Sequence, residues 1–196
     1  SEMRVPMGQN LGSSTLHFAT SISEIEQFSD ILPILLDAGL DINVIDQFGR
    51  TPLMTTVAGQ CAVFEMLLKN GADPEIQDYE GNTVLHYLCG HDYSLKLEDR
   101  KTYIDWHIER FKGFLSAVKD LHKIIHVEND KGLTPLDCLC KNPNSGSVVF
   151  IKPLIEAGAN PFHQSKFGQT AWELMSNLPH FRNSKTFWEI NQKRYT

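Results

Sequence analysis

The chain has little of what a nucleic-acid-binding or membrane-spanning protein needs. Its 18 lysines and arginines are outnumbered by 24 aspartates and glutamates, which gives a formal net charge of −6. Proteins that bind phosphate backbones instead concentrate basic residues on one surface. No apolar run approaches the roughly 18 residues of a spanning helix, and residues 1–9 lack the regions of a secretion signal. We therefore expect neither nucleic-acid binding nor membrane insertion.

Cysteine is also scarce, with four residues at Cys61, Cys89, Cys138 and Cys140. A chain of 196 residues, 41% of them hydrophobic, can bury a core without cross-links. We predict free thiols and an intracellular, reducing compartment. That compartment is the cytoplasm or the nucleus, or the host cytoplasm if the chain is a secreted bacterial effector.

What the sequence does contain is a repeat. Four segments align: DQFGRTPLM from Asp46, DYEGNTVLH from Asp78, NDKGLTPLD from Asn129 and SKFGQTAWE from Ser165. Their glycines are 32, 51 and 36 residues apart. A second mark, Gly-Leu-Asp or Gly-Ala-Asp/Asn, starts at Gly39, Gly71 and Gly158, ten residues before a glycine of the first mark. Two independent marks in one register indicate a repeat architecture.

The threonine of each segment has the chemistry of a helix start. A threonine side chain can accept a backbone N–H there, and a following proline loses no hydrogen bond. Thr170 with Glu173 has the spacing of a capping box, and Thr134 with Asp137 approximates one. The glycines of the second mark follow apolar runs, where a left-handed residue closes a helix. Each repeat is therefore predicted to contain two short helices.

TPLM, TVLH and TPLD resemble the TPLH of ankyrin repeats, and the Gly-Ala-Asp mark resembles their linker. The resemblance covers residues 12–176. It implies an all-α ankyrin-repeat solenoid of about five helix–turn–helix units with short hairpin fingers. The expected boundaries are 1–11 (a tail or expression remnant), 12–45, 46–77, 78–128, 129–164, 165–176 (a partial repeat) and 177–196 (a C-terminal helical cap containing Phe187 to Ile190).

Three departures from the pattern give specific expectations. The 51-residue spacing indicates an insertion of about 18 residues in the third repeat, roughly from His91 to Asp105. Residues 123–126 replace the usual glycine ending there, so that helix must end differently. Pro33 is expected in a first helical turn capped by Ser29, and Pro153 is expected to bend or delay its helix.

Candidate chemistry is sparse, and we expect no catalysis, cofactor or metal. His86, Cys89 and His91 are close together in sequence, but the resemblance implies that His86 bonds near Thr83 and that Cys89 fills a packed small-residue position. Cys138 and Cys140 lie about 200° apart on a helix, so they should not pair. The alternatives are a thiol- or metal-dependent enzyme around Cys89–His91, or the substrate-recruiting domain of a longer enzyme.

The resemblance implies a scaffold or adaptor, monomeric by itself, that binds a partner protein through its finger tips and inner-helix ends. Phe48, Tyr79 and Phe167 are either interface anchors or rings that fold back on the neighbouring finger. The residues carried over are Gln47, Phe48, Arg50, Tyr79, Glu80, Asn82, His91, Lys131, Leu133, Lys141, Asn142, Lys166, Phe167 and Gln169.

Overall fold

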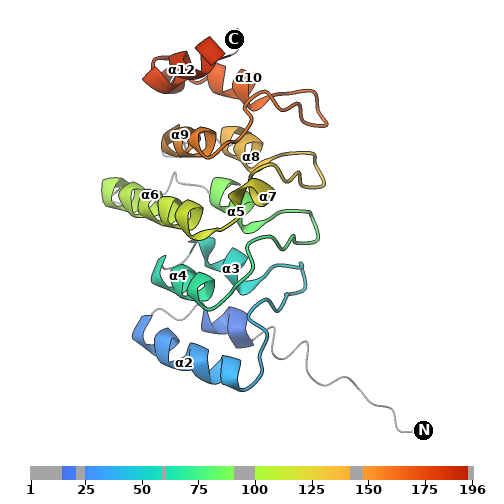
Figure 1. Cartoon of the computed structure of the whole chain (residues 1–196), viewed down its shortest axis with the longest axis vertical. Coiled ribbons are helices and arrows are strands. Elements are labelled where there is room, and N and C mark those ends of the chain that lie inside the picture. Colours follow the sequence, from blue (N-terminus) through green and yellow to red (C-terminus); the bar gives the residue numbers. More distant parts are fainter. Residues whose placement is uncertain (1–14, 21–24, 59–60, 91–99, 142–147, 194–196) are drawn as a thin grey trace, which may run out of the picture. The chain divides into compact units, whose positions relative to one another are not determined.

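The computed structural model describes residues 15–20, 25–58, 61–90, 100–141 and 148–193 (Figure 1). The chain divides into two compact parts, Ser1–Tyr79 and Glu80–Thr196, each of which is described by itself. The described residues form helices joined by extended loops, and among them a single isolated bridge, Gln164 with Thr170, is the only β-type pairing. The predicted all-α fold is confirmed.

The N-terminal part contains two helix pairs. Residues 15–19 and α2 (Ile25–Asp37) make the first, and α3 (Pro52–Thr55), extended by a 3₁₀ turn at Thr56–Ala58, with α4 (Cys61–Lys69) make the second. α2 packs against α4. The buried side chains of these two pairs include Leu16, Phe28, Leu32, Leu53, Phe64 and Leu67. Neither pair could bury these side chains alone, so the repeats stabilise each other.

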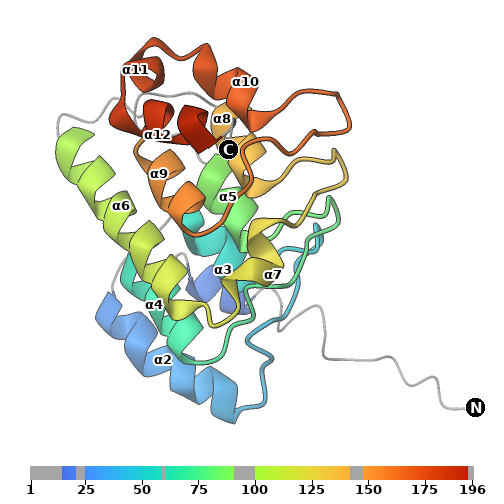
Figure 2. The same cartoon turned by 45° about the horizontal axis from the view of Figure 1, so that its top comes forward.

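The C-terminal part repeats this arrangement three times. The helices are α5 (Val84–Gly90), α6 (Arg100–Ala117), α7 (Leu121–Ile125), α8 (Pro135–Lys141), α9 (Val148–Glu156), α10 (Ala171–Ser176), α11 (Pro179–Arg182) and α12 (Lys185–Lys193). The inner helices α5, α8 and α10 stack in that order, with α6 and α9 beside them as an outer layer (Figures 1 and 2). Phe111 of α6 and Phe150 of α9 join the outer layer, with ring centroids 4.9 Å apart.

The last two helices cover the exposed side of α10. Phe187 and Ile190 of α12 and Phe181 of α11 are buried. The Phe187 ring stacks on Trp172 of α10, with centroids 4.9 Å apart and planes 16° from parallel. An apolar inner helix at the end of a stack is thereby removed from water.

The expected helix starts and ends are present. Thr51 accepts the Met54 amide at the start of α3, and Thr170 with Glu173 forms a complete capping box at the start of α10. Gly39, Gly71 and Gly158 close their helices with φ of 87°, 91° and 106°. The third repeat ends differently, as expected: α7 follows α6, and its Ile124 and Ile125 are buried where a glycine turn would otherwise lie.

Pro33 does not lie in a first helical turn, and Pro153 does not delay the start of its helix. Pro33 lies well inside α2, and the Ser29 hydroxyl donates to the Glu26 carbonyl instead of capping a helix. Pro33 is exposed, so water can satisfy the carbonyl that its missing N–H leaves free. Pro153 does not delay its helix, because α9 already begins at Val148.

Part of the region where the insertion is expected is helical. α6 begins at Arg100, so residues 100–105 belong to the outer helix of the third repeat. Residues 91–99 lie outside the described residues.

Candidate functional site

Three fingers share one hairpin, built from main-chain hydrogen bonds. The amide of the first residue donates to the carbonyl of the fifth at 3.0 Å, and the glycine amide donates back to the carbonyl of the first at 2.7–3.0 Å. The glycine lies at φ of 67–78°, which favours a residue without Cβ. The three fingers are residues 46–50, 129–133 and 165–169.

The first residue of two fingers fixes the tip with its side chain. Asp46 Oδ1 accepts the amides of Phe48 and Arg50, both at 2.9 Å. Asn129 Oδ1 accepts the amides of Lys131 and Leu133 at 3.0 and 3.1 Å. Our sequence reasoning did not assign this role, although the recurrence of Asp or Asn at this position was its signal.

Asp46 is also an ion-pair partner. Its carboxylate lies 2.7 Å from the Arg50 guanidinium. Burial opposes its ionisation, but the hydrogen bonds from the Arg50 side chain and from the Arg50 and Phe48 amides outweigh burial. The pKa of Asp46 is therefore below its ordinary value.

Neighbouring fingers are connected in the N-terminal part. The Tyr79 amide donates to the Phe48 carbonyl at 3.1 Å. A Cβ on Gly49 would come within 2.7 Å of a Tyr79 ring carbon, so the ring packs directly on this glycine. The Arg50 guanidinium lies over the Phe48 ring, with its Cζ atom 4.7 Å from the ring centroid.

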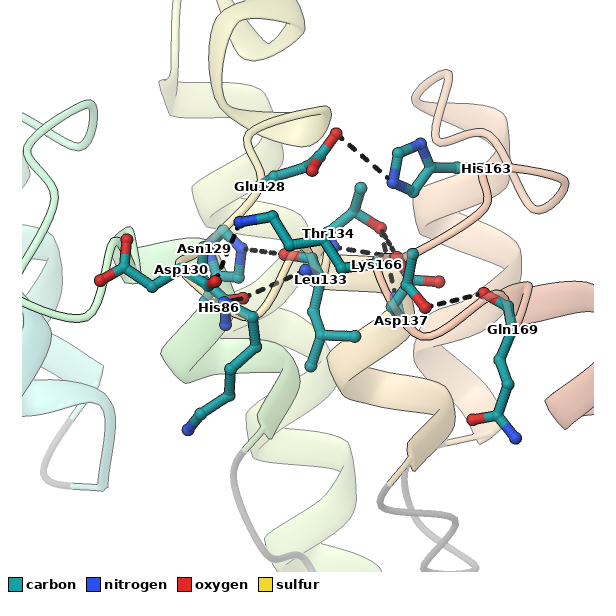
Figure 3. A network of polar contacts seen from close by, with 12 residues as sticks. His86, Glu128, Asn129, Asp130, Leu133, Thr134, Asp137, His163, Lys166 and Gln169 are labelled. Atoms are coloured by element: carbon teal, nitrogen blue, oxygen red, sulfur yellow. Dashed lines mark hydrogen bonds and ion pairs between the residues drawn. The ribbon is translucent and has the colours of Figure 1, made fainter.

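The C-terminal part repeats the connection. The Asp130 amide donates to the Glu80 carbonyl at 2.9 Å. The Lys166 ammonium donates to the Asp130 carbonyl at 3.0 Å, while its aliphatic stem packs on Gly132 (Figure 3). The fingers of this part are thus held in place by backbone and side-chain bonds together.

The inner-helix end also joins this surface. Lys141 is the last residue of α8, and its ammonium lies 4.8 Å from the centroid of the Phe167 ring. The two residues come from successive repeats, and both were predicted to contact a partner.

Most of the predicted contact residues are exposed. Phe48, Tyr79 and Phe167 expose 53%, 67% and 63% of their surface. Leu133 differs: it is only 6% exposed, so its side chain is not available to a partner. Of the others, Gln47, Glu80, Lys131, Lys141, Lys166 and Gln169 are exposed, Arg50 and Asn82 are half-buried, and His91 and Asn142 lie outside the described residues.

His86 is a structural residue. Its Nδ1 accepts the Thr83 amide at 3.1 Å, and its Nε2 lies 3.0 Å from the Leu133 carbonyl (Figure 3). Because the amide can only donate, Nδ1 is unprotonated, and Nε2 carries the proton that bonds Leu133. Both ring nitrogens are therefore engaged within the fold. Asp137 occupies the same place in the next repeat, where Oδ2 accepts the Thr134 amide at 2.9 Å.

The thiols are poorly suited to nucleophilic or metal chemistry. Cys89, Cys138 and Cys140 are free. Burial raises the pKa of Cys89 and Cys140 well above the ordinary value and that of Cys138 to about 11. A nucleophile or metal ligand needs the thiolate instead. In the part of the chain that the structure describes, no three His, Cys, Asp or Glu residues come together as a metal site.

A helix that spans a bilayer must be both long and apolar. Among the described residues, no helix is both long enough and apolar enough to cross a membrane.

Comparison with known proteins agrees with the repeat pattern. Residues 7–97 match a family model described as ankyrin repeats in three copies. The chain is 28% identical over 212 residues to a putative ankyrin repeat protein of Acanthamoeba polyphaga mimivirus, covering 94% of this chain and 27% of that protein. It is 27% identical over 165 residues to a probable E3 ubiquitin-protein ligase of Oryza sativa subsp. japonica, covering 76% of this chain and 31% of that protein. It is 26% identical over 159 residues to NF-kappa-B inhibitor alpha of Mus musculus, covering 76% of this chain and 43% of that protein.

The chain thus spans less than half of each of these relatives. The structure of this chain displays capped helix pairs and glycine-hinged fingers in one register. Residues 7–97 of the chain match ankyrin repeats, and the chain is similar to an ankyrin repeat protein over 94% of its length.

Proposed function

We propose that this chain is a protein–protein interaction scaffold or adaptor, which binds a partner protein through its finger tips and the adjoining inner-helix end. One observation carries the proposal. Phe48, Tyr79 and Phe167 expose more than half of their surface to water, although Phe48 and Phe167 sit on hairpins held by main-chain bonds and the Tyr79 amide is bonded to the Phe48 carbonyl. Exposed aromatic rings on an ordered frame are typical anchors of protein interfaces.

The hairpins support the proposal because they reduce the cost of binding. A loop that orders only on contact loses conformational entropy at that moment, and this loss weakens affinity. In the fingers, the amides around Asp46 and Asn129 are already bonded in the free protein. A partner would therefore meet side chains whose backbone is already in place.

The proposed contact surface is the predicted set without Leu133, whose side chain is buried. We propose no catalytic role, since the described thiols are held protonated by burial. The free state of these thiols supports a reducing compartment. That the chain is monomeric by itself, and that it acts as a bacterial effector in a host cell, stay predictions.

Affinity capture with the full chain, followed by mass spectrometry, tests the proposal. The variants are Phe48→Ala and Phe167→Ala, and Ile34→Ala on α2 is the matched control because Ile34 is also an exposed apolar residue. We expect the tip variants to lose captured partners about tenfold while their Tm stays within about 2 °C of the parent. The control should capture the same partners as the parent.

Two results would contradict this function. One is capture that the tip variants leave unchanged. The other is a drop in Tm large enough to show that the Phe48 and Phe167 rings stabilise the fold. Tyr79 is left out of the test because its ring packs on Gly49, so its removal would change both binding and stability.

A second candidate is the substrate-recruiting domain of a longer enzyme. The similarity to a probable E3 ubiquitin-protein ligase favours it. The full reading frame, and the activity of the longer protein with residues 12–176 deleted, would test it. Loss of substrate turnover with intact activity of the remaining domain supports recruitment, and unchanged turnover contradicts it.

A further inference from the structure

Three lysines and one exposed aromatic ring lie on two neighbouring fingers and the end of α8 in the C-terminal part. Lys131 lies on one finger, Lys166 on the next, and Lys141 at the end of α8. Lys141 lies over the Phe167 ring at 4.8 Å, and the Lys166 ammonium bonds the Asp130 carbonyl beside Lys131. We call Lys131, Lys141, Lys166 and Phe167 the lysine–aromatic patch.

Direct contacts join the two fingers and the end of α8 that carry these lysines, because the Lys166 stem packs on Gly132 and the Lys141 ammonium lies over the Phe167 ring. Both Lys141 and Lys131 act on the Cys138 thiol, where their charges oppose the rise in pKa that burial causes. One of these lysines comes from a finger and the other from a helix end.

The charge of this patch is only partly compensated within the described residues. Lys131 pairs with Glu80 at 3.4 Å, but both side chains are more than 60% exposed, so water and salt weaken the pair. The Lys141 ammonium lies over the face of the Phe167 ring, and the Lys166 ammonium donates to the Asp130 carbonyl. In the described part of the chain, neither has a carboxylate within ion-pair distance. The patch is thus positive on a chain whose formal net charge is −6.

We infer that the lysine–aromatic patch binds an acidic peptide segment of the partner protein. This inference rests on the proposed function and names the chemistry of the partner. Carboxylates of the segment would lie against Lys131, Lys141 and Lys166, and an apolar side chain would lie on the exposed part of Phe167. The Lys166 stem and the Lys141–Phe167 contact hold these groups in position before binding.

A peptide segment fits this charge pattern better than a longer polyanion does. Salt screens charges beyond about 8–10 Å, so a short segment responds mainly to the local positive patch. A nucleic acid or an anionic membrane would extend over the rest of an acidic chain, which would repel it. These ligands are outcomes of the test below.

The test is peptide display on the immobilised full chain. The parent is compared with the double variant Lys141→Gln, Lys166→Gln. The matched control is Lys152→Gln, Lys185→Gln, which removes two exposed lysines from the same part of the chain, each paired with a glutamate one helical turn away. Enriched peptides are then synthesised, and their affinities are measured by fluorescence anisotropy, with a single-stranded oligonucleotide and phosphatidylserine vesicles as further probes.

We expect the parent to enrich peptides rich in aspartate and glutamate with one or two large apolar residues. Affinity for these peptides should fall about tenfold in the patch variant and less than twofold in the control, since losing two charge contacts and a cation–π contact changes affinity on that scale. Lys141→Arg should retain binding, because it keeps the charge over the Phe167 ring.

Enriched peptides without acidic residues, or acidic peptides that bind the patch variant as well as the parent, would overturn the inference. If peptides of either kind still bound more weakly to the Phe48→Ala or Phe167→Ala variant, the proposed function would stand and only the acidic-peptide inference would fail. Tighter binding of the oligonucleotide or the vesicles than of any peptide would also overturn the inference. No enriched peptide and no captured protein would overturn both.

Discussion

The His86 ring joins two successive repeats, with Nδ1 accepting the Thr83 amide at 3.1 Å and Nε2 donating to the Leu133 carbonyl at 3.0 Å. The same ring therefore caps the start of α5 and secures the finger that leads into α8. Asp137 and Glu173 cap their own helices in the equivalent places, but the contact with the following finger is made here by the second nitrogen of a histidine.

The His86 bridge leads to the first prediction. His86→Ala leaves a buried amide and a buried carbonyl without partners and opens a cavity, so the free energy of unfolding should fall by about 3 kcal/mol. Urea unfolding followed by circular dichroism measures it. His122→Ala, at an exposed position, should change stability by less than about 0.5 kcal/mol. Equal effects of the two variants would show that the bridge contributes little.

The finger glycines allow backbone strain and steric clash to be separated. Gly49 and Gly168 have similar φ, 78° and 74°, so alanine costs about 1–2 kcal/mol at either from its left-handed conformation. At Gly168 the nearest atom to an added Cβ is 3.8 Å away, whereas at Gly49 the Tyr79 ring and backbone lie at 2.7–2.9 Å. Gly49→Ala should therefore lower Tm clearly more than Gly168→Ala. Equal shifts in a thermal melt would mean that Tyr79 moves away at no cost.

The lowered pKa of Asp46 predicts a specific pH dependence. A carboxyl whose pKa is lower in the folded than in the unfolded state stabilises the fold above its unfolded value of about 3.9. This contribution is lost as the pH falls through the folded pKa. Asp46→Asn keeps the acceptor that the Phe48 and Arg50 amides use, as Asn129 does in its finger. The stability difference between parent and variant should thus be present at pH 6 and shrink below about pH 4, as measured by denaturant unfolding across that range. A difference that does not change with pH would show that Asp46 acts only as a hydrogen-bond acceptor.

The buried thiols predict slow modification. Cys89 and Cys140 are buried and Cys138 is half-buried with a pKa of about 11, so little thiolate is present at pH 8. Iodoacetamide should modify these three thiols slowly in the folded chain, with Cys138 the first of them, and much faster in denaturant. Peptide mass spectrometry gives the order of labelling. Rapid labelling of Cys89 in the native protein would revive the interpretation as a thiol-dependent enzyme.

The local features of this fold were predictable because neighbouring residues encode them. The capping bonds of Thr51, Thr134 and Thr170 span three residues, and a left-handed glycine needs only its own freedom of rotation. The same reasoning failed for Pro33, since the start of α2 depends on packing against α4 as well as on proline.

Contacts across repeats were less predictable. The contact of Lys141 with Phe167 joins residues that lie 26 positions apart, and no spacing rule indicates it. The burial of Leu133 did leave a signal. The other fingers carry Arg50, Asn82 and Gln169 at this position, and an apolar residue among polar ones indicates a side chain that turns inward.

The main-chain hairpin separates what folds the finger from what distinguishes one finger from the next. Its shape depends on two backbone bonds and a glycine, and in two fingers also on a first residue whose side chain accepts amides, so the hairpin itself does not specify the side chains of the two residues between them. They are Gln47-Phe48, Tyr79-Glu80, Asp130-Lys131 and Lys166-Phe167, and no two pairs are alike. Evolution or design can therefore exchange the side chains of these pairs to choose a new partner, except where one packs on the neighbouring finger as Tyr79 and Lys166 do.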